Sequence, residues 1–324
     1  MTHLLASRRR IVLAAAAAST APLWAHAEER YPSKPIRIVV PFGAGGSPDV
    51  YSRILAAELQ RRTGVVVTVE NRSGANSMLG THHVAKGSPA DGYTILYGTN
   101  SGLSAARAMV RTVPYNPTGD LAGVAMVGDS SFVLVTRTQD KVTLAELVRL
   151  MRQHPGKYEI GGASVTTKVV DGMLTTVGKL DHVYVPYKEN ARMLNELMAG
   201  EISYGFSPIA SAVKLIETGK IAPIAVTGPA RVSALPDVPS LSEVLPGVSL
   251  TTWTGYFVAA RTPRHIVDYL HRTLSEINEM PELKSLTEQS GRTLRMKPEE
   301  IDAFVKKDEQ RWVQLFRDAG IQPE

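Results

Sequence analysis

A glycine-rich segment near the start of the chain has residue types that can bind an anion. It lies between an apolar run, Ile36–Val40, and an amphipathic run, Val50–Leu59, and reads Pro41-Phe42-Gly43-Ala44-Gly45-Gly46-Ser47-Pro48-Asp49. The patterns predict a strand, a loop and a helix, with Ser47 as N-cap and Pro48 at the first helical position. Several free N–H groups would then point into one small volume, which suits a carboxylate. The alternative is a tight strand-to-helix turn without a ligand.

No recognisable catalytic motif accompanies this segment. The sequence has no G-x-S-x-G nucleophile elbow, no G-x-G-x-x-G fingerprint, no phosphate-binding Gly-Lys-Ser/Thr and no H-E-x-x-H. It also has no cysteine, which excludes disulfides, thiol catalysis and thiolate metal sites. We therefore expect a binding protein without a cofactor or a metal. The main alternative is an exported α/β hydrolase that assembles dispersed Ser, His and Asp residues.

The first 27 residues have the three parts of an export signal. Arg8–Arg10 are charged, Ile11–Ala18 form a short apolar region, and Ala25-His26-Ala27 offers small residues for cleavage. The apolar region is too short to span a bilayer, and no later segment has about 18 uninterrupted apolar residues. We expect cleavage before Glu28 and no membrane insertion of the mature chain. Both the general secretory route and the twin-arginine route fit the signal.

The charge of the chain gives no indication of a nucleic-acid partner. Residues 1–27 hold three arginines and no acidic residue, so their removal lowers the formal net charge from +5 to +2. The remaining Lys and Arg residues are scattered, whereas a nucleic-acid surface gathers them in a patch or stripe. We therefore expect no nucleic-acid binding.

Short apolar runs alternate with helical stretches over most of the chain. This alternation is typical of α/β domains with parallel sheets covered by helices on both faces. The expected strands are 36–40, 65–69, 94–97, 124–127, 132–135, 158–160, 183–185, 202–206 and 224–226. The expected helices are 50–61, 144–153, 169–177 and 191–198, followed by two packing helices that begin at Thr262-Pro263 and at Lys297-Pro298.

Two long extended stretches can carry the chain between two lobes. Residues 121–135 and 252–260 are apolar and lie about 130 residues apart in the sequence. The predicted lobes are residues 28–125 with 255–324, and residues 126–254. In this arrangement a hinge joins the lobes and a ligand cleft lies between them. The alternative is two strands of one large sheet.

An ordered series of short motifs resembles one family along almost the whole mature chain. The series begins with the 41–49 segment and continues with 69–72, 74–75, 91–94, 114–117, 185–188, 219–220, 225–228, 235–239, 311–312 and 319–321. It resembles the tripartite tricarboxylate transporter receptors, also called the Bug family of periplasmic binding proteins. The resemblance implies a periplasmic protein with a two-lobed α/β fold of the Venus-flytrap type (periplasmic binding protein type II), with two crossover strands and a C-terminal helical segment.

The resemblance also implies a function and a set of ligand-binding residues. Family members bind small carboxylates between the lobes and deliver them to a two-component inner-membrane permease. Asp49 is expected to orient its loop more than to touch an anion, since two negative charges repel. The residues carried over to this chain are Phe42, Gly43, Ala44, Gly45, Gly46, Ser47, Asp49, Thr99, Asn100, Ser164, Thr166, Thr167, Lys168, Tyr187 and Ser207.

The chain departs from the family pattern at its second candidate loop. Residues 161–168 read Gly-Gly-Ala-Ser-Val-Thr-Thr-Lys, one residue shorter than the usual family loop, with Val165 in place of a glycine. Lys168 either adds a cation to the cleft or is a solvated helix lysine. Ser207-Pro208 replaces an Asp-Asn pair of the family. In relatives that bind amino acids this Asp can contact the ligand ammonium, so its absence makes an amino-acid ligand less favourable here. The sequence leaves the ligand open, as it leaves open whether the chain serves transport or docks onto a signalling partner.

Overall fold

The computed structural model describes residues 31–323, so the predicted signal segment 1–27 lies outside the described residues. From residue 34 onward the chain forms one compact α/β unit with two five-stranded sheets. None of the helices in the described part of the chain has the length and apolar character needed to cross a membrane.

The first sheet, called sheet A, has the strand order β2-β1-β3-β10-β4. Strands β1, β2 and β3 are parallel, and β10 runs antiparallel to both β3 and β4. Strand β4 therefore runs in the same direction as β1. The bounds of these strands are Ile36–Val40 for β1, Val67–Asn71 for β2, Thr94–Thr99 for β3, Leu121–Ser130 for β4 and Thr252–Ala259 for β10.

The second sheet, called sheet B, repeats this plan with the order β7-β6-β8-β5-β9. Strands β6, β7 and β8 are parallel, whereas β5 runs antiparallel to β8 and β9. The bounds are Phe132–Arg137 for β5, Glu159–Gly162 for β6, Val183–Pro186 for β7, Tyr204–Pro208 for β8 and Ile221–Val226 for β9.

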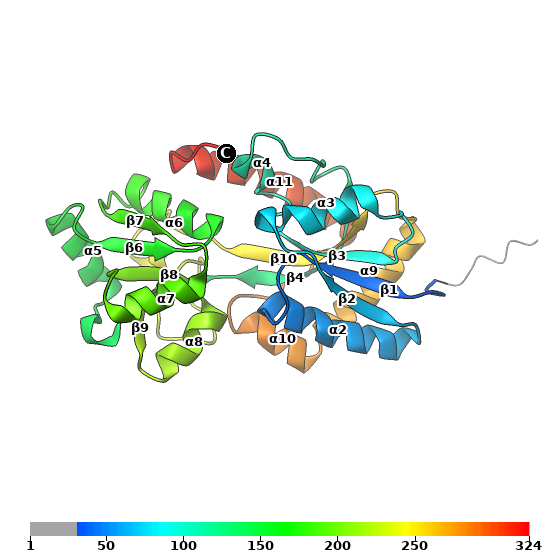
Figure 1. Ribbon diagram of the computed structural model, residues 1–324, viewed down its shortest axis with the longest axis horizontal. Helices are drawn as coiled ribbons and strands as arrows, with labels where there is room; N and C mark the ends of the chain where they lie inside the picture. The colour runs from blue at the N-terminus through cyan, green and yellow to red at the C-terminus, as the bar shows by residue number, and fades with distance from the viewer. Residues whose placement is uncertain (1–30, 324) are drawn as a thin grey trace, which may run out of the picture. The chain divides into compact units, whose positions relative to one another are not determined.

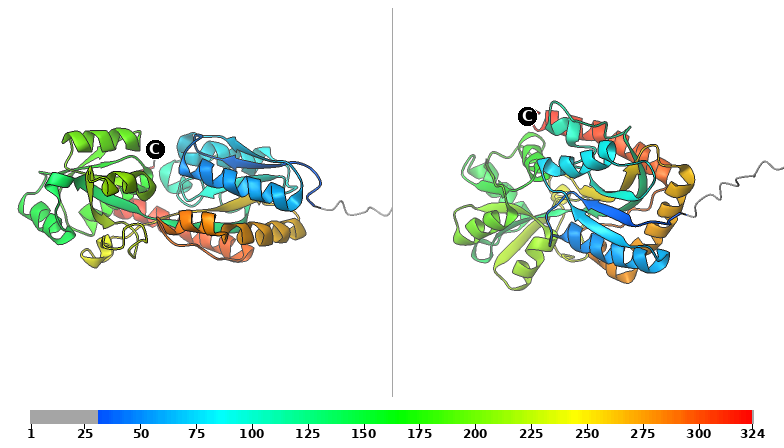
Figure 2. Two further views of the ribbon diagram at one scale, coloured as in Figure 1. Left: turned by 90° about the horizontal axis from the view of Figure 1, so that it is seen from below. Right: turned by 45° about the vertical axis from the view of Figure 1, so that its right-hand side comes forward.

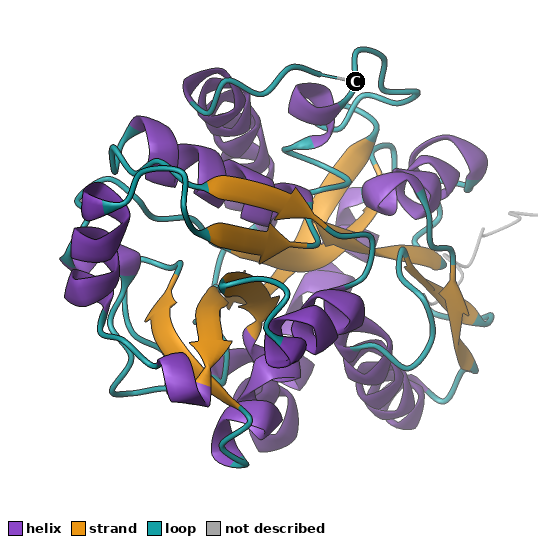
Figure 3. Ribbon diagram, turned by 60° about the vertical axis from the view of Figure 1, so that its left-hand side comes forward, coloured by secondary structure: helices purple, strands orange, loops and turns teal. Residues whose placement is uncertain are grey.

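Helices cover both faces of each sheet (Figures 1, 2 and 3). Alternation along the strands explains this: Val133 and Val135 pack in one apolar cluster and Leu134 in another, because successive side chains point to opposite faces. Around sheet A lie α2 (Ser47–Thr63), α3 (Met78–Gly87), α4 (Ala106–Met109), α9 (Arg264–Asn278), α10 (Pro281–Glu288) and α11 (Pro298–Asp318). Around sheet B lie α5 (Leu144–Gln153), α6 (Val165–Thr176), α7 (Asn190–Ala199) and α8 (Ile209–Glu217).

The chain passes between the sheets at two neighbouring points. It leaves sheet A at Ser130 and enters sheet B at Phe132, and it returns to sheet A at Thr252, which pairs with Ser130. The Thr227 hydroxyl accepts a hydrogen bond from the Phe132 amide at 3.0 Å beside the outgoing crossing. Strand pairing thus places residues 126–130 and 252–254 in sheet A, although the predicted lobe boundaries assign them to the second lobe.

The C-terminal helix α11 contacts elements around both sheets. Ile301 and Val305, in its first half, pack with β4 and β10 residues in one apolar cluster. Trp312 and Phe316, in its second half, belong to a cluster that contains α5 and α6 side chains. Figure 1 shows α11 in red extending from the sheet A elements toward α6. This helix therefore links the two sheets by side-chain packing, in addition to the two chain crossings.

Candidate functional site

The carboxyl-terminal edges of the two sheets meet at the crossing. Strands β1 and β3 run parallel to β4, so their ends at Val40 and Thr99 lie at the edge where β4 leaves sheet A. In sheet B the first residue of β5, Phe132, pairs with Pro208 at the end of β8, and β6 is parallel to β8. The two predicted ligand loops, which follow β1 and β6, therefore begin at edges that adjoin one connection. Ligands of open α/β sheets bind at such edges.

Asp49 organises the loop that follows β1. Its carboxylate is 3% exposed and accepts hydrogen bonds from the Gly45 amide at 2.9 Å, Asn71 Nδ2 at 3.0 Å and Arg53 Nε at 3.0 Å. The Arg53 hydrogen bond, followed by those from Gly45 and Asn71, lowers the pKa of Asp49 from 3.8 to about 2. Every strong acceptor site of this carboxylate is used within the protein. Asp49 therefore orients the loop. Its carboxylate is not placed to contact an anion directly.

The start of α2 differs from the prediction in its cap. Gly46 is the N-cap, Ser47 is the first helical residue, and the side chain that bonds back to the loop is Asp49. Gly45 has a φ of +81°, a left-handed conformation that glycine adopts readily. Gly43, Ala44, Gly46 and Ser47 are exposed, and within residues 34–323 their N–H groups have no protein acceptor. They are the donors that this loop can offer to a ligand, at the positive end of the α2 dipole.

The loop after β3 adds a buried amide to the same sheet edge. Thr99 and Asn100 are 5% and 2% exposed. The Thr99 hydroxyl accepts from the Gly102 amide at 3.4 Å. The Asn100 backbone is fully engaged, since its N–H donates to the Trp253 carbonyl and its C=O accepts from the Ala105 amide. Its side-chain Nδ2, however, is buried and has no hydrogen-bond partner in the part of the chain that the structure describes. A buried donor without a partner is costly, which makes Asn100 suited to an acceptor brought by a ligand.

A capping box builds the second loop, at the start of α6. The Ser164 hydroxyl accepts from the Thr167 amide at 3.2 Å, and the Thr167 hydroxyl accepts from the Ser164 amide at 3.1 Å. Both hydroxyls are thus committed to the helix start, although the sequence suggested them as ligand donors. The backbone N–H groups of Val165 and Thr166 have no protein acceptor in the described part of the chain. These two amides are the donors left at the second helix N-terminus.

The glycine pair before this capping box is required by packing. A Cβ on Gly162 would lie 2.6 Å from the Thr167 hydroxyl and 2.7 Å from the Tyr184 hydroxyl. A Cβ on Gly161 would meet Ile202 at 2.7 Å. Both glycines lie in β6, so they allow neighbouring side chains to approach the strand and do not form a flexible loop.

The remaining predicted site residues differ in how free their polar atoms are. The Tyr187 hydroxyl donates to Glu196 at 2.6 Å. Ser207 is fully buried in β8 and donates to the Pro208 carbonyl at 3.2 Å. Lys168 is exposed on α6 and forms no ion pair within the described residues. Phe42 accepts from Asn71 Nδ2 through its carbonyl oxygen. Tyr187 and Ser207 can therefore offer a ligand little more than contact surface.

A strained segment beside the loop after β3 was not predicted. Ala75, Asn76 and Ser77 have φ values of 45°, 51° and 74°. Residues other than glycine rarely adopt such positive values. The segment is close to the loop after β3, because a Cβ on Gly102 would lie 3.3 Å from the Ser77 carbonyl. Gly74 was the only sequence signal for this conformation.

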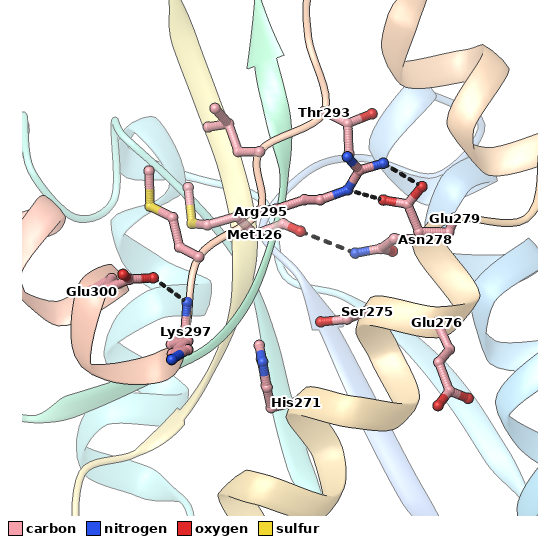
Figure 4. A pocket seen from close by; sticks show the side chains of 12 residues that line it. Met126, His271, Ser275, Glu276, Asn278, Glu279, Thr293, Arg295, Lys297 and Glu300 are labelled. Atoms are coloured by element: carbon pink, nitrogen blue, oxygen red, sulfur yellow. Dashed lines mark hydrogen bonds and ion pairs between the residues drawn. The ribbon is translucent and has the colours of Figure 1, made fainter.

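A cavity of about 460 Å³ lies elsewhere, between α9 and the segment before α11 (Figure 4). Met126 belongs to its wall, and His271 Nδ1 donates a hydrogen bond to the Val124 carbonyl, 2.7 Å away. Arg295 binds both oxygens of Glu279 at its rim. Several of the cavity's polar groups are thus engaged within the protein, whereas the Thr293 hydroxyl is buried with no hydrogen-bond partner among the described residues. The cavity is separate from the two loops. Within the described residues no group of three or more His, Asp or Glu residues could hold a metal ion.

Comparisons with known proteins identify the family. Residues 51–321 match the model of the tripartite tricarboxylate transporter family receptor, TctC. The chain is 30% identical over 303 residues to protein BugT of Bordetella pertussis, covering 90% of this chain and 91% of BugT. The chain therefore belongs to the tripartite tricarboxylate transporter receptor family, as the sequence motifs predicted.

Two solved structures of relatives share the two-lobed fold. Rpa4515 of R. palustris, solved with adipate, has a TM-score of 0.79 and 29% identity, and the match covers 91% of this chain and 100% of that one. MatC (Rpa3494) of Rhodopseudomonas palustris, solved with bound malate, has a TM-score of 0.73 and 26% identity, covering 88% of this chain and 99% of that one. These matches confirm the predicted two-lobed fold of periplasmic binding proteins. Together with the family, they support a solute-binding role.

Proposed function

We propose that this chain is a periplasmic receptor that binds a small dicarboxylate or tricarboxylate between its lobes and delivers it to a two-component membrane permease. The observation that carries the proposal is the pair of helix N-termini with unused N–H groups at adjoining sheet edges. These are Gly43, Ala44, Gly46 and Ser47 in the first loop, and Val165 and Thr166 in the second, none of which has an acceptor within the described residues. A carboxylate accepts hydrogen bonds only, so it matches such donors.

The strength of the contacts is compatible with tight binding of a small ligand. Each helix terminus contributes about 0.3–1 kcal/mol toward an anion, and each hydrogen bond to a charged group about 1.5–3 kcal/mol. Closing the lobes removes water, which strengthens every one of these contacts. After the cost of ordering, a handful of them corresponds to a dissociation constant around micromolar. A ligand that touches both loops also favours the closed state, which the permease would recognise.

The ligand class follows from the two separate sets of donors. Adipate and malate, the ligands of the two relatives, each carry two carboxylates. A ligand with one carboxylate can engage only one loop and does not favour closure. Ser207 supplies no charge for an ammonium group, so we expect acidic amino acids to bind more weakly than the matching acids without an amine.

Calorimetric titration tests this function. The protein is unfolded and refolded to remove bound ligand, and is then titrated with adipate, malate, citrate, acetate and glutamate. We expect one dicarboxylate or tricarboxylate to bind with a dissociation constant near micromolar, and acetate at least about 100-fold more weakly. For adipate, 1,6-hexanediol is the matched uncharged control. Absence of binding across the panel would contradict the proposed function.

A further inference from the structure

A buried carboxylate on α11 connects three segments that lie far apart in the sequence: the loop after β3, strand β10 and α11 itself. Asp308 is 4% exposed. Its Oδ2 accepts hydrogen bonds from Ser104 Oγ at 2.6 Å, Trp253 Nε1 at 2.6 Å and Trp312 Nε1 at 3.1 Å. Arg311 Nη1 lies 3.6 Å from the other oxygen. Burying a carboxylate is costly unless it is hydrogen-bonded, so this arrangement fixes the three donors relative to one another.

Two of the residues that donate to Asp308 also lie against the backbone of Asn100. The Asn100 N–H donates to the Trp253 carbonyl at 3.2 Å, and the Asn100 carbonyl lies 3.5 Å from the Ser104 hydroxyl. Asp308 binds the side chains of the same two residues. Asn100, Trp253, Asp308 and Ser104 thus form a closed ring of contacts. The side-chain Nδ2 of Asn100 is buried and has no hydrogen-bond partner among residues 31–323.

The third donor leads toward the second loop. Trp312 is 1% exposed and packs in the apolar cluster that includes Val169, Val170 and Met173 of α6. Helix α6 begins at the Ser164 capping box. Asp308 therefore lies between the loop after β3 and the helix that carries the second set of ligand donors.

We propose that Asp308 is a positioning residue of the carboxylate site. Through Ser104 and Trp253 it holds Asn100 so that Nδ2 can donate to a ligand carboxylate, and through Trp312 it couples this loop to α6. The inference rests on the proposed function. It goes further in assigning a binding role to a residue on a helix that the sequence indicated only for packing.

The test compares Asp308→Asn with Asp302→Asn on the same helix. Asp302 accepts a hydrogen bond from the Gly123 amide at 2.8 Å. It is not part of the ring of contacts formed by Asn100, Trp253, Asp308 and Ser104. Adipate and malate are titrated at a temperature where both variants are folded by circular dichroism. We expect Asp308→Asn to weaken binding about five- to tenfold, and Asp302→Asn to leave the dissociation constant within about twofold of wild type. Ser104→Ala should weaken binding by a smaller factor and add nothing in the Asp308→Asn background, because the two act as one unit.

Tryptophan fluorescence supplies a second readout of ligand binding at this cluster. The chain has three tryptophans, Trp24, Trp253 and Trp312, and the last two are both bonded to Asp308. In the full chain with Trp24→Phe, saturating ligand should change the emission, and this change should be lost with Asp308→Asn.

The outcomes separate the two proposals. Wild-type affinity in folded Asp308→Asn overturns the positioning role alone, as does an equal loss in Asp302→Asn. Should Asp308→Asn fail to fold, unchanged affinity in Ser104→Ala overturns it. No binding by the wild type contradicts the proposed function, and the positioning role with it.

Discussion

The Gly45 amide donates to the Asp49 carboxylate over 2.9 Å, and this bond closes the first loop on its own helix. Asp49 is thereby a built-in anion that uses one loop amide and leaves others unused. The Arg53 guanidinium beside it balances the charge, at 3.0 Å. A ligand carboxylate consequently meets a loop whose shape is set before binding, which lowers the ordering cost of association.

Replacing Asp49 with asparagine tests this role. Asparagine keeps the size but loses the charge that holds Arg53, so the loop should be less ordered and adipate or malate should bind about five- to tenfold more weakly. Glu58→Gln is the matched control, because Glu58 is also an arginine-bound carboxylate on α2. Calorimetry should find wild-type affinity in the control. Tighter binding in Asp49→Asn would instead mean that Asp49 repels the ligand directly.

The same carboxylate predicts a pH dependence of stability. The pKa of Asp49 falls from 3.8 to about 2 on folding, chiefly through its hydrogen bond with Arg53. A lowered pKa in the folded state stabilises the protein above the unfolded pKa, and this contribution is lost as the pH falls from 3.8 toward 2. The difference in unfolding free energy between wild type and Asp49→Asn should be constant above about pH 5 and shrink below pH 3.8. Denaturant unfolding at pH 6, 4 and 3 measures it, and a difference that grows in acid would contradict the assignment.

Local signals account for the elements that the sequence predicted well. Helix α5 has the predicted bounds, Leu144–Gln153, because Thr143 and Glu146 form a capping box before a strongly amphipathic run. Helix α6 was expected from Val169 but begins at Val165. Its capping box pairs Ser164 at the N-cap with Thr167 at the N3 position, where the familiar pattern has Glu or Gln.

The parts of the site that depend on distant contacts were not predictable from one sequence. Asp308 reads as one more polar residue of an amphipathic helix, and its partner Ser104 is 204 residues away. The hydroxyls of Ser164 and Thr167 were expected to face a ligand, and only their mutual hydrogen bonds show that they serve the helix start. Residue type indicated that donors were present, but hydrogen-bond pairing decided which of them are free.

The conformation of Gly45 gives a paired test within one loop. Alanine at Gly45 must adopt a φ of +81°, which costs an L-residue about 1–2 kcal/mol. Alanine at Gly43 meets no atom within 4 Å and requires no left-handed φ. We expect Gly45→Ala to lower stability and weaken carboxylate binding, and Gly43→Ala to leave stability unchanged. Thermal unfolding measures the stability and calorimetry measures the binding. Equal effects of the two substitutions would contradict the fixed loop conformation.

A second N-cap in the same lobe makes it possible to distinguish the effect of the α6 capping box on stability from its effect on ligand binding. Ser164→Ala and Thr143→Ala each remove an N-cap hydroxyl, so each should cost about 1 kcal/mol of stability. Only Ser164→Ala disturbs the Val165 and Thr166 amides proposed to bind the ligand. Calorimetry at a temperature where both variants are folded should therefore find weaker binding for Ser164→Ala alone. Weaker binding in both variants would indicate a general effect of lobe stability.

The contact between Gly172 on α6 and Ala319 at the end of α11 predicts the effect of separating these helices. A Cβ on Gly172 would lie 2.4 Å from the Ala319 Cβ and 3.0 Å from its Cα. Gly172→Ala should therefore push α11 away from α6 and destabilise the protein by about 1–3 kcal/mol, the usual cost of overpacking. Because α6 carries the second set of donors, carboxylate affinity should fall with it. Adding Ala319→Gly removes the closer clash and should restore part of both losses in thermal unfolding and calorimetry. A Gly172→Ala protein with wild-type stability would show that the helices are free to separate, and that α11 does not hold the second lobe in place.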